Sequence, residues 1–354
     1  MPDQKTFLDD IESIKEIDLG HYHTYITEIP SQCETAYMQM AEIEIPENYK
    51  NPQNVIICGM GGSAIGADLA RTFLPDDINA PVTVHRDYDL PAYVNSNTLV
   101  VCSSFSGETE EVLSSFYDAL AKKAKIFVIA GGGTLVELAK ANSIPYYQFS
   151  YKSQPRATLG FVMIALLALF EKIGIFSNSL DIPKTADFLK KVISELSLET
   201  PTEKNKAKLL AYKIFDRMLI VAGSGILTEV ARRWKCQFNE NAKAFAFFEI
   251  LPELNHNAVE GIHFPKFMRD EAMFLLLENS YDHPQNKKRF VILKELFNEQ
   301  NVAYESIPAL GDTVLEQKLS SVIFGDYVSY YLAILNKIDP TPVDTIQWAK
   351  KKLK

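Results

Sequence analysis

A cluster of hydroxyl side chains marks one short turn of the sequence as a site able to bind an anion. Ser104, Ser106 and Thr109 stand within six residues around Gly107, between a strand-like apolar run and a helical pattern. Ser and Thr are good helix caps, so a single capping hydroxyl is the ordinary structural interpretation. Three hydroxyls exceed that need, and a helix N-terminus adds free N–H groups and a positive dipole end. The pattern therefore indicates a phosphate-binding turn.

A second turn of similar character lies earlier in the chain, at Gly59-Met-Gly-Gly-Ser63. It follows an apolar run and opens a helix. Gly61 and Gly62 permit positive φ and close backbone approach, and Ser63 adds a hydroxyl donor. A tight turn without any ligand explains the glycines alone about equally well. With the hydroxyls of the later turn, however, Ser63 is expected to converge on one phosphate.

The earlier turn also fits a loose dinucleotide fingerprint. Gly59, Gly61 and Ala64 match the G-x-G-x-x-A spacing, and Asp87 falls near the end of the next strand, where a ribose-binding acid would lie. The hydroxyl-rich later turn weighs against this interpretation. A cradle of hydroxyls without a P-loop lysine suits a sugar phosphate better than a nucleotide.

The elements around both turns alternate between strand and helix. Short apolar runs at residues 54–58, 81–85, 98–103, 125–130 and 145–149 predict strands, and helical patterns lie between them. This alternation is typical of the α/β class with a doubly wound parallel sheet. Ligands bind such sheets at the carboxyl edge, where both turns are expected.

The beginning of this pattern recurs about 165 residues later, where residues 217–225 again form an apolar run ending in a Gly/Ser turn. The repeat predicts two copies of one α/β unit. The expected division is an N-terminal helical segment at 1–50, a first domain at 51–152, connecting helices at 153–200, and a second domain with a C-terminal helix at 201–354. Further strands are expected at 272–277 and 303–307, and helices at 313–335 and from 343.

Composition excludes several classes of function. The chain has 354 residues, 47% of them hydrophobic, and a net charge of −9, which disfavours bulk attraction to nucleic acid or an anionic membrane. Its four cysteines show neither zinc nor disulfide spacing, and Cys58 and Cys102 lie in apolar strand-like runs, which predicts that these two are buried free thiols. No leader pattern opens the chain and no apolar run is long enough for a membrane span, so the cytoplasm is the expected location.

Four segments carry a more specific pattern: GMGGSAIG, SFSGETEE, PRATLG and QFNENAKAFAFFEILPELNHNAVEG. Together they resemble the bifunctional phosphoglucose/phosphomannose isomerase family of the sugar isomerase (SIS) superfamily, from about residue 50 to the C-terminus. The resemblance implies an α/β fold of two tandem SIS-type doubly wound parallel-sheet domains with three αβα layers. It implies that the phosphate-binding loops include Ser63, Ser104, Ser106, Thr109, Gly61 and Gly62.

The same resemblance implies the catalytic roles. It matches Arg156 to charge stabilisation of the intermediate, Glu240 to the catalytic base and His256 to ring opening. It also matches Lys350 to a C-terminal active-site lysine, although this residue begins a basic tail that is otherwise expected to be solvated. Thr341 and Thr345 are both candidates for the family's substrate-contacting threonine.

The implied reaction is aldose–ketose isomerisation of glucose 6-phosphate, mannose 6-phosphate and fructose 6-phosphate through a cis-enediol. No metal or redox cofactor is expected, and the implied assembly is a homodimer with the histidine contributed across the interface. Three alternative functions stay open. The first is a dehydrogenase that binds a dinucleotide at the Gly59–Ala64 fingerprint described above. The second is another SIS enzyme, such as a ketosamine-phosphate isomerase or deglycase, and the third is a non-catalytic sugar-phosphate sensor.

Overall fold

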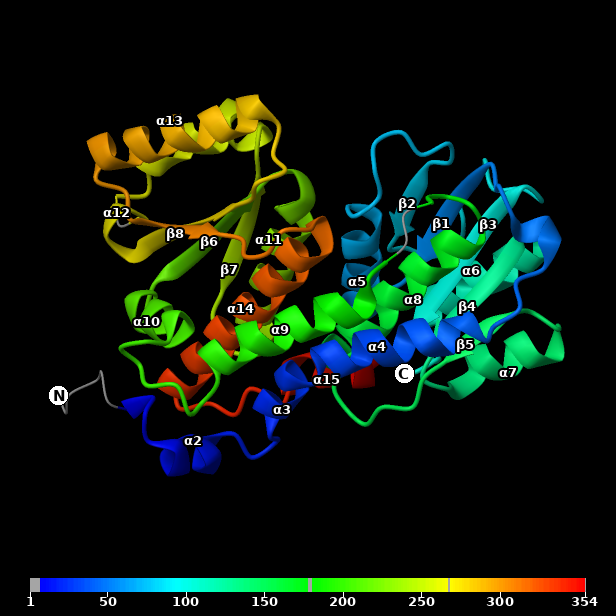
Figure 1. Ribbon diagram of the computed structural model, residues 1–354, viewed down its shortest axis with the longest axis horizontal. Coiled ribbons are helices and arrows are strands. Elements are labelled where there is room, and N and C mark those ends of the chain that lie inside the picture. Colours follow the sequence, from blue (N-terminus) through cyan, green and yellow to red (C-terminus); the bar gives the residue numbers. More distant parts are fainter. Residues whose placement is uncertain (1–6, 178–179, 267, 354) are drawn as a thin grey trace. The chain divides into compact units, whose positions relative to one another are not determined.

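The computed structural model describes residues 7–177, 180–266 and 268–353, and the chain divides into two compact units (Figure 1). The first unit is Glu28–Asp187, and the second combines the residues up to Thr27 with those from Phe188 onward. The four-segment division expected from the sequence stays a prediction. The units cut across its N-terminal segment, because the helices on either side of Thr27 pack against helices of different units, α14 and α8.

The first unit is built on a parallel sheet of five strands in the order β2-β1-β3-β4-β5. Its strands are β1 (Asn54–Cys58), β2 (Val82–His85), β3 (Thr98–Ser104), β4 (Lys125–Ala130) and β5 (Tyr146–Gln148). The five predicted strands and the doubly wound arrangement are thus confirmed. Strand order reverses between β1 and β3, so this pair forms the topological switch point where such folds bind ligands.

Helices cover both faces of this sheet. They are α4 (Ile29–Ala41), α5 (Gly61–Arg71), α6 (Glu110–Ala121), α7 (Gly133–Ala141) and α8 (Leu159–Lys172), with short 3₁₀ turns η1 (Glu47–Tyr49) and η2 (Pro155–Ala157). α6 and α7 pack through Phe116 and Leu135 against one face of the sheet. α4 and α5 pack against α8, which is buried on every side from Leu159 to Phe170, as expected for a helix that is apolar all round.

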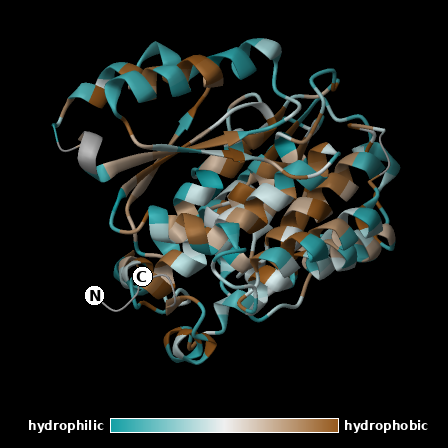
Figure 2. Ribbon diagram, turned by 60° about the vertical axis from the view of Figure 1, so that its left-hand side comes forward, coloured by the Kyte–Doolittle hydropathy of each residue, from teal (hydrophilic) through white to brown (hydrophobic). Residues whose placement is uncertain are grey.

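The second unit repeats the architecture with four parallel strands in the order β7-β6-β8-β9. They are β6 (Met218–Gly223), β7 (Ala246–Ile250), β8 (Ala272–Glu278) and β9 (Tyr304–Pro308). The strands predicted at 217–225, 272–277 and 303–307 are confirmed, whereas β7 was not predicted. In Figure 2 the strands beneath α13 (Pro284–Gln300) are coloured largely as hydrophobic residues, whereas α13 itself contains both hydrophobic and hydrophilic residues.

The remaining helices complete the second unit or lead into it. They are α2 (Ile11–Ile17), α3 (Tyr22–Thr27), α9 (Ile182–Leu196), α10 (Lys206–Lys213), η3 (Gly225–Leu227), α11 (Thr228–Glu240), η4 (Glu253–His256), η5 (Ala258–His263), α12 (Met268–Glu271), α14 (Val314–Leu335) and α15 (Asp344–Leu353). α10 and α11 pack against the long α14. The N-terminal segment joins them because the Tyr330 hydroxyl donates to the buried Asp18 carboxylate at 3.1 Å.

Two helices begin later than the helical patterns of the sequence, which predict helices from 107 to 123 and from about 156 to 172. α6 begins at Glu110 rather than Gly107, because Gly107 has a φ of +71° and belongs to the preceding turn. Similarly, Arg156 lies in η2, and α8 begins only at Leu159. Part of the polar stretch that the sequence shows at 176–184 lies outside the described residues. Within the part of the chain that is described, no helix is both long and apolar enough to cross a membrane.

Candidate functional site

The turn after β1 presents an exposed backbone at the start of a helix. Gly61 has a φ of +49°, and a Cβ placed on it would meet nothing within 4 Å among the described residues. Ser63 follows in the first turn of α5 and is buried. The turn is tight on its inner side, since a Cβ on Gly59 would come within 3.2 Å of the Ser103 carbonyl. Glycine therefore lets the β1 turn approach the end of β3 and leaves an open helix N-terminus suited to an anion.

Arg156 is held beside this same turn. A Cβ on Gly62 would lie 2.5 Å from the carbonyl oxygen of Pro155, so only glycine allows η2 to press against the start of α5. η2 contacts α5, and Arg156 itself is 3% exposed. A buried guanidinium is always charged and offers fixed donors. The structure thus brings one predicted catalytic residue to the predicted phosphate turn.

The turn after β3 gathers the other hydroxyls. The oxygens of the Ser104 and Thr109 hydroxyls are 2.8 Å apart. Ser104 Oγ also accepts a hydrogen bond from the backbone N–H of Gly107 at 3.1 Å. Ser106 Oγ accepts the amide of Glu108 at 3.2 Å. Thr109 is the N-cap residue of α6 but its side chain makes no capping hydrogen bond. Its hydroxyl therefore does not serve the ordinary capping role and is paired with Ser104.

The acidic residues of this turn are engaged elsewhere, as expected for residues beside a phosphate. Glu108 accepts the amide and hydroxyl of Thr134 at 2.6 and 3.0 Å, and the Tyr88 hydroxyl donates to Glu110. The Gly131–Gly133 segment does more than precede α7. A Cβ on Gly133 would lie 2.3 Å from the Ser106 carbonyl, so these glycines let α7 support the hydroxyl turn.

The other predicted catalytic residues belong to the second unit. Glu240 is the last residue of α11 and is half-buried, whereas His256 ends η4 and is exposed. The loop around the histidine is fixed by Asn257, whose amide nitrogen donates to Glu253 at 2.7 Å. Lys350 is exposed on α15, a helix none of whose residues is buried. Within this unit, the three residues lie on three separate elements, α11, η4 and α15.

The second sheet has its own turn at the place where the first has its glycine loop. β6 ends in Gly223-Ser224-Gly225, and Gly225 has a φ of +50°. Here a carboxylate fills the space: Ser224 Oγ donates to Asp282 Oδ2 at 2.5 Å, and Asp282 Oδ1 has no hydrogen-bond partner among the described residues. Burial raises the pKa of Asp282, and the hydrogen bond from Ser224 offsets part of that rise. This turn is therefore unfavourable for an anion.

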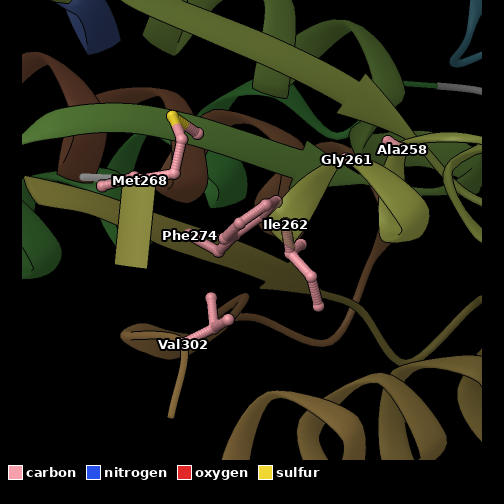
Figure 3. A pocket seen from close by; sticks show the side chains of 7 residues that line it. Ala258, Gly261, Ile262, Met268, Phe274 and Val302 are labelled. Carbon is pink, nitrogen blue, oxygen red and sulfur yellow. The ribbon is translucent and has the colours of Figure 1, made fainter. Parts of the chain in front are cut away.

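An apolar pocket also lies in the second unit, beneath η5 and α12. Its volume is about 200 Å³, and Figure 3 shows Ile262, Met268, Phe274 and Val302 around it. The lining offers hydrocarbon rather than phosphate ligands, so the pocket does not extend the hydroxyl-lined site. In the first unit, Cys58 and Cys102 are buried free thiols on neighbouring strands, as predicted.

Sequence reasoning missed two residues that the structure brings forward. Asp282 has no local signal, because its role depends on its distance from a turn 58 residues earlier. Lys243 lies two residues after the Asn239-Glu-Asn241 motif, but three of its four carbonyl partners lie at residues 339–342. Neither position could be singled out by periodicity or spacing.

Two doubly wound parallel sheets, with hydroxyls at the first switch point, define a protein of the sugar-isomerase α/β class. A family model described as the bacterial phospho-glucose isomerase C-terminal SIS domain matches residues 203–353. The tagatose-6-phosphate ketose/aldose isomerase structure from Escherichia coli shares the fold, with a TM-score of 0.67 and 17% identity over 92% of this chain and 97% of that one.

Sequence relatives identify the family. The bifunctional phosphoglucose/phosphomannose isomerase of Caldicellulosiruptor bescii is 41% identical over 327 residues, 92% of this chain and 96% of that protein. The enzyme of the same name from Aquifex aeolicus is 34% identical over 92% of this chain and 98% of its own length. The chain belongs to the bifunctional phosphoglucose/phosphomannose isomerase family.

Proposed function

We propose that this protein interconverts glucose 6-phosphate, mannose 6-phosphate and fructose 6-phosphate by moving a proton between carbons 1 and 2 of the open-chain sugar. The observation that supports the proposal is the first switch point, where Ser63 lies in the first turn of α5 after β1 and the paired Ser104 and Thr109 hydroxyls follow the neighbouring strand β3. Hydroxyls and backbone amides there suit a phosphate monoester. Ser106 and the amides of Gly61 and Gly62 complete the proposed phosphate site.

The proposed chemistry divides between charge stabilisation and proton transfer. Arg156, buried beside the phosphate turn, supplies a permanent positive charge for the developing enediolate oxygen. The Glu240 carboxylate takes the proton from carbon 2 of the aldose and returns it to carbon 1. His256 moves the ring-oxygen and hydroxyl protons during ring opening. Lys350 is the proposed C-terminal cation of the site.

Access to both aldoses requires rotation about the carbon 2–carbon 3 bond of the enediol, so that the proton can return to either face. No hydride is transferred, and the reaction as proposed needs no metal or redox cofactor. Because charged sugar phosphates do not cross a bilayer unaided, the proposed location is the cytoplasm.

The deciding experiment is a coupled assay of the EDTA-treated protein with fructose 6-phosphate, reading glucose 6-phosphate and mannose 6-phosphate separately. Formation of both products without added metal is expected. One product alone narrows the specificity. Neither product from a folded protein refutes the proposal, and turnover of an amino-sugar phosphate would then favour the ketosamine-phosphate enzyme. Sugar-phosphate binding without any turnover would favour the sensor.

We further propose a homodimer whose sites are shared. Two observations support it: His256 is exposed rather than packed, and the edge strand β7 carries Phe247, 44% exposed, beside Phe245, 70% exposed. Large apolar side chains on an open sheet edge favour association. Mixing inactive Glu240→Gln and His256→Ala protomers tests the idea, with recovery of about a quarter of the activity expected from statistical mixing. No recovery in verified mixed dimers refutes a shared site.

A further inference from the structure

The Lys243 side chain forms a clamp between two backbone segments of the second unit. Its ammonium donates to the carbonyl oxygens of Glu240 and Pro342, both at 2.7 Å. It also lies 3.3 Å from the carbonyl of Asp339 and 3.2 Å from that of Pro340. Four carbonyl oxygens therefore surround one cationic group, although the residue lies at the surface.

The position of this cation follows from the end of α11. The last carbonyls of a helix have no intrahelical partner, and the negative end of the helix dipole attracts a cation. Glu240 is the last residue of the helix, and Lys243 has a φ of +53°, which reverses the chain so that its side chain folds back over the helix end. The ammonium thus satisfies an orphan carbonyl of the helix and, with its other protons, the 339–342 turn.

The clamp joins two segments that carry proposed active-site residues. One is the end of α11 with Glu240, and the other is the 339–342 turn, which leads directly into α15 with Lys350. A Cβ on Gly20 would overlap Thr341 Oγ1, so the N-terminal segment presses on the same turn from another side. None of the residues of α15 is buried, so this helix lacks core packing to fix its start.

We propose that Lys243 is a positioning residue, whose ammonium holds the 339–342 turn and the start of α15 against the Glu240 end of α11. This inference rests on the proposed isomerase function. Lys243 acts through the backbone of Glu240 and does not itself touch substrate. Because the phosphate hydroxyls lie in the other unit, loss of the clamp disturbs the proton-transfer geometry and leaves phosphate recognition intact.

The test compares Lys243→Met with Lys337→Met. Lys337 is a matched control, because it is also exposed, follows a helix of the same unit and has a φ of +55°. We expect Lys243→Met to lower kcat by at least about tenfold with less than about a threefold change in KM, since small misplacements of catalytic groups are costly. Lys337→Met should stay within about twofold of the parent. Equal kcat values in the two variants, with equal stability, overturn the proposal.

Chemical restoration separates the charge from the bulk of the side chain. Lys243→Cys treated with 2-bromoethylamine regains an ammonium at almost the original position, whereas iodoacetamide adds similar bulk without charge. The parent protein is treated in parallel because Cys236 is only half-buried. Recovery of kcat with the amine but not the amide supports the clamp. Equal behaviour of the two adducts overturns it.

A measurement without turnover keeps the inference separate from the proposed function. Hydrogen exchange of the backbone amides between residues 341 and 350 should be faster in Lys243→Met than in Lys337→Met. Trp348 is exposed on α15, and acrylamide should quench its fluorescence more strongly in Lys243→Met than in Lys337→Met. If the parent protein fails to convert fructose 6-phosphate, the proposed function fails while these readouts still judge the clamp. Unchanged exchange and quenching refute the clamp even if the parent is active.

Discussion

At the end of β1 the chain leaves space above a glycine, whereas at the end of β6 it fills that space with a carboxylate. Both turns place a glycine at nearly the same φ, +49° for Gly61 and +50° for Gly225. A Cβ on Gly225 would lie 2.8 Å from Asp282 Oδ1, while one on Gly61 would meet no described atom within 4 Å. The backbone conformation of the repeat is thus retained, whereas the second turn holds an acidic side chain where the first has open space.

This difference separates the proposed tasks of the two units. An anion-favouring helix start with buried Arg156 suits the first unit for phosphate recognition. In the second unit, a carboxylate stands at the start of the η3–α11 segment, and the proposed base Glu240 stands at its far end. Repetition of a fold therefore does not repeat the site, because a single acidic side chain can close the equivalent position.

The largest expected effect tests whether chemistry and recognition are separable in this way. Glu240→Gln should lower kcat by about 10²–10⁴-fold, the usual contribution of a general base, because the amide cannot accept the carbon-bound proton. The affinity for fructose 6-phosphate, measured by calorimetry, should change by less than about threefold. Loss of binding along with activity would show that the second unit also holds the substrate, which breaks the comparison.

The hydroxyl turns provide the next contrast. Combining Ser104→Ala with Thr109→Val removes two proposed phosphate donors, and each hydrogen bond to a charged group is worth about 1.5–3 kcal/mol. We expect KM for fructose 6-phosphate to rise by at least about 100-fold, with a smaller change in kcat. Ser224→Ala in the second turn is the matched control and should leave KM within about twofold. A similar rise in KM for the control would contradict the assignment of phosphate binding to the first unit.

Most of the sheets could be predicted because buried parallel strands read as continuous apolar runs. The strand β7 was missed because Ala246–Ile250 lies inside a segment whose charged and polar neighbours resemble a catalytic loop. The residues up to Thr27 were not assigned to the second unit, because contacts such as Asp18 with Tyr330 join positions 312 residues apart. Local patterns carry no information on such pairs.

The candidate site divides in the same way. The hydroxyls and glycines of the first switch point were found because both turns follow strands that meet at one edge. Lys243 and Asp282 were missed, since one acts on carbonyls 96–99 residues away and the other on a hydroxyl 58 residues away. The role of the Gly131–Gly133 segment could not be predicted, because the close contact of Gly133 with the Ser106 carbonyl is tertiary.

Substituting two glycines of the first unit should change the free energy of unfolding, an effect smaller than those predicted for kcat and KM. Gly107 has a φ of +71°, and a Cβ there would lie 1.9 Å from the Gly132 carbonyl, so Gly107→Ala combines strain with overlap. Gly61→Ala meets only the left-handed backbone strain, about 1–2 kcal/mol. Denaturant unfolding should therefore show a distinctly larger loss for Gly107→Ala. Equal losses would mean that the hydroxyl turn yields easily and is not held in place by α7.

The smallest effect concerns the carboxylate that closes the second turn. Burial raises the pKa of Asp282 above its unfolded value, so the folded state binds this proton more tightly. Stability from this group is therefore greatest at low pH and is lost as the pH rises from the unfolded pKa through the raised folded pKa. Asp282→Asn should raise Tm near pH 7.5 by roughly 1–4 °C, and the gain should shrink as the pH falls.

A second buried aspartate of the same unit supplies the opposite case. The Asp326 carboxylate accepts from Arg233 at 2.6 Å and from Gln237 at 2.9 Å, so its charge is compensated. Asp326→Asn should destabilise the protein at pH 7.5 by about 3–5 kcal/mol, because it removes the negative charge that compensates a buried guanidinium. If Asp282→Asn were destabilising in the same way, the Asp282 carboxylate would have to bind a cation or pair with another group of the protein. The two switch points would then differ in the ligand they hold, and not in whether they are open.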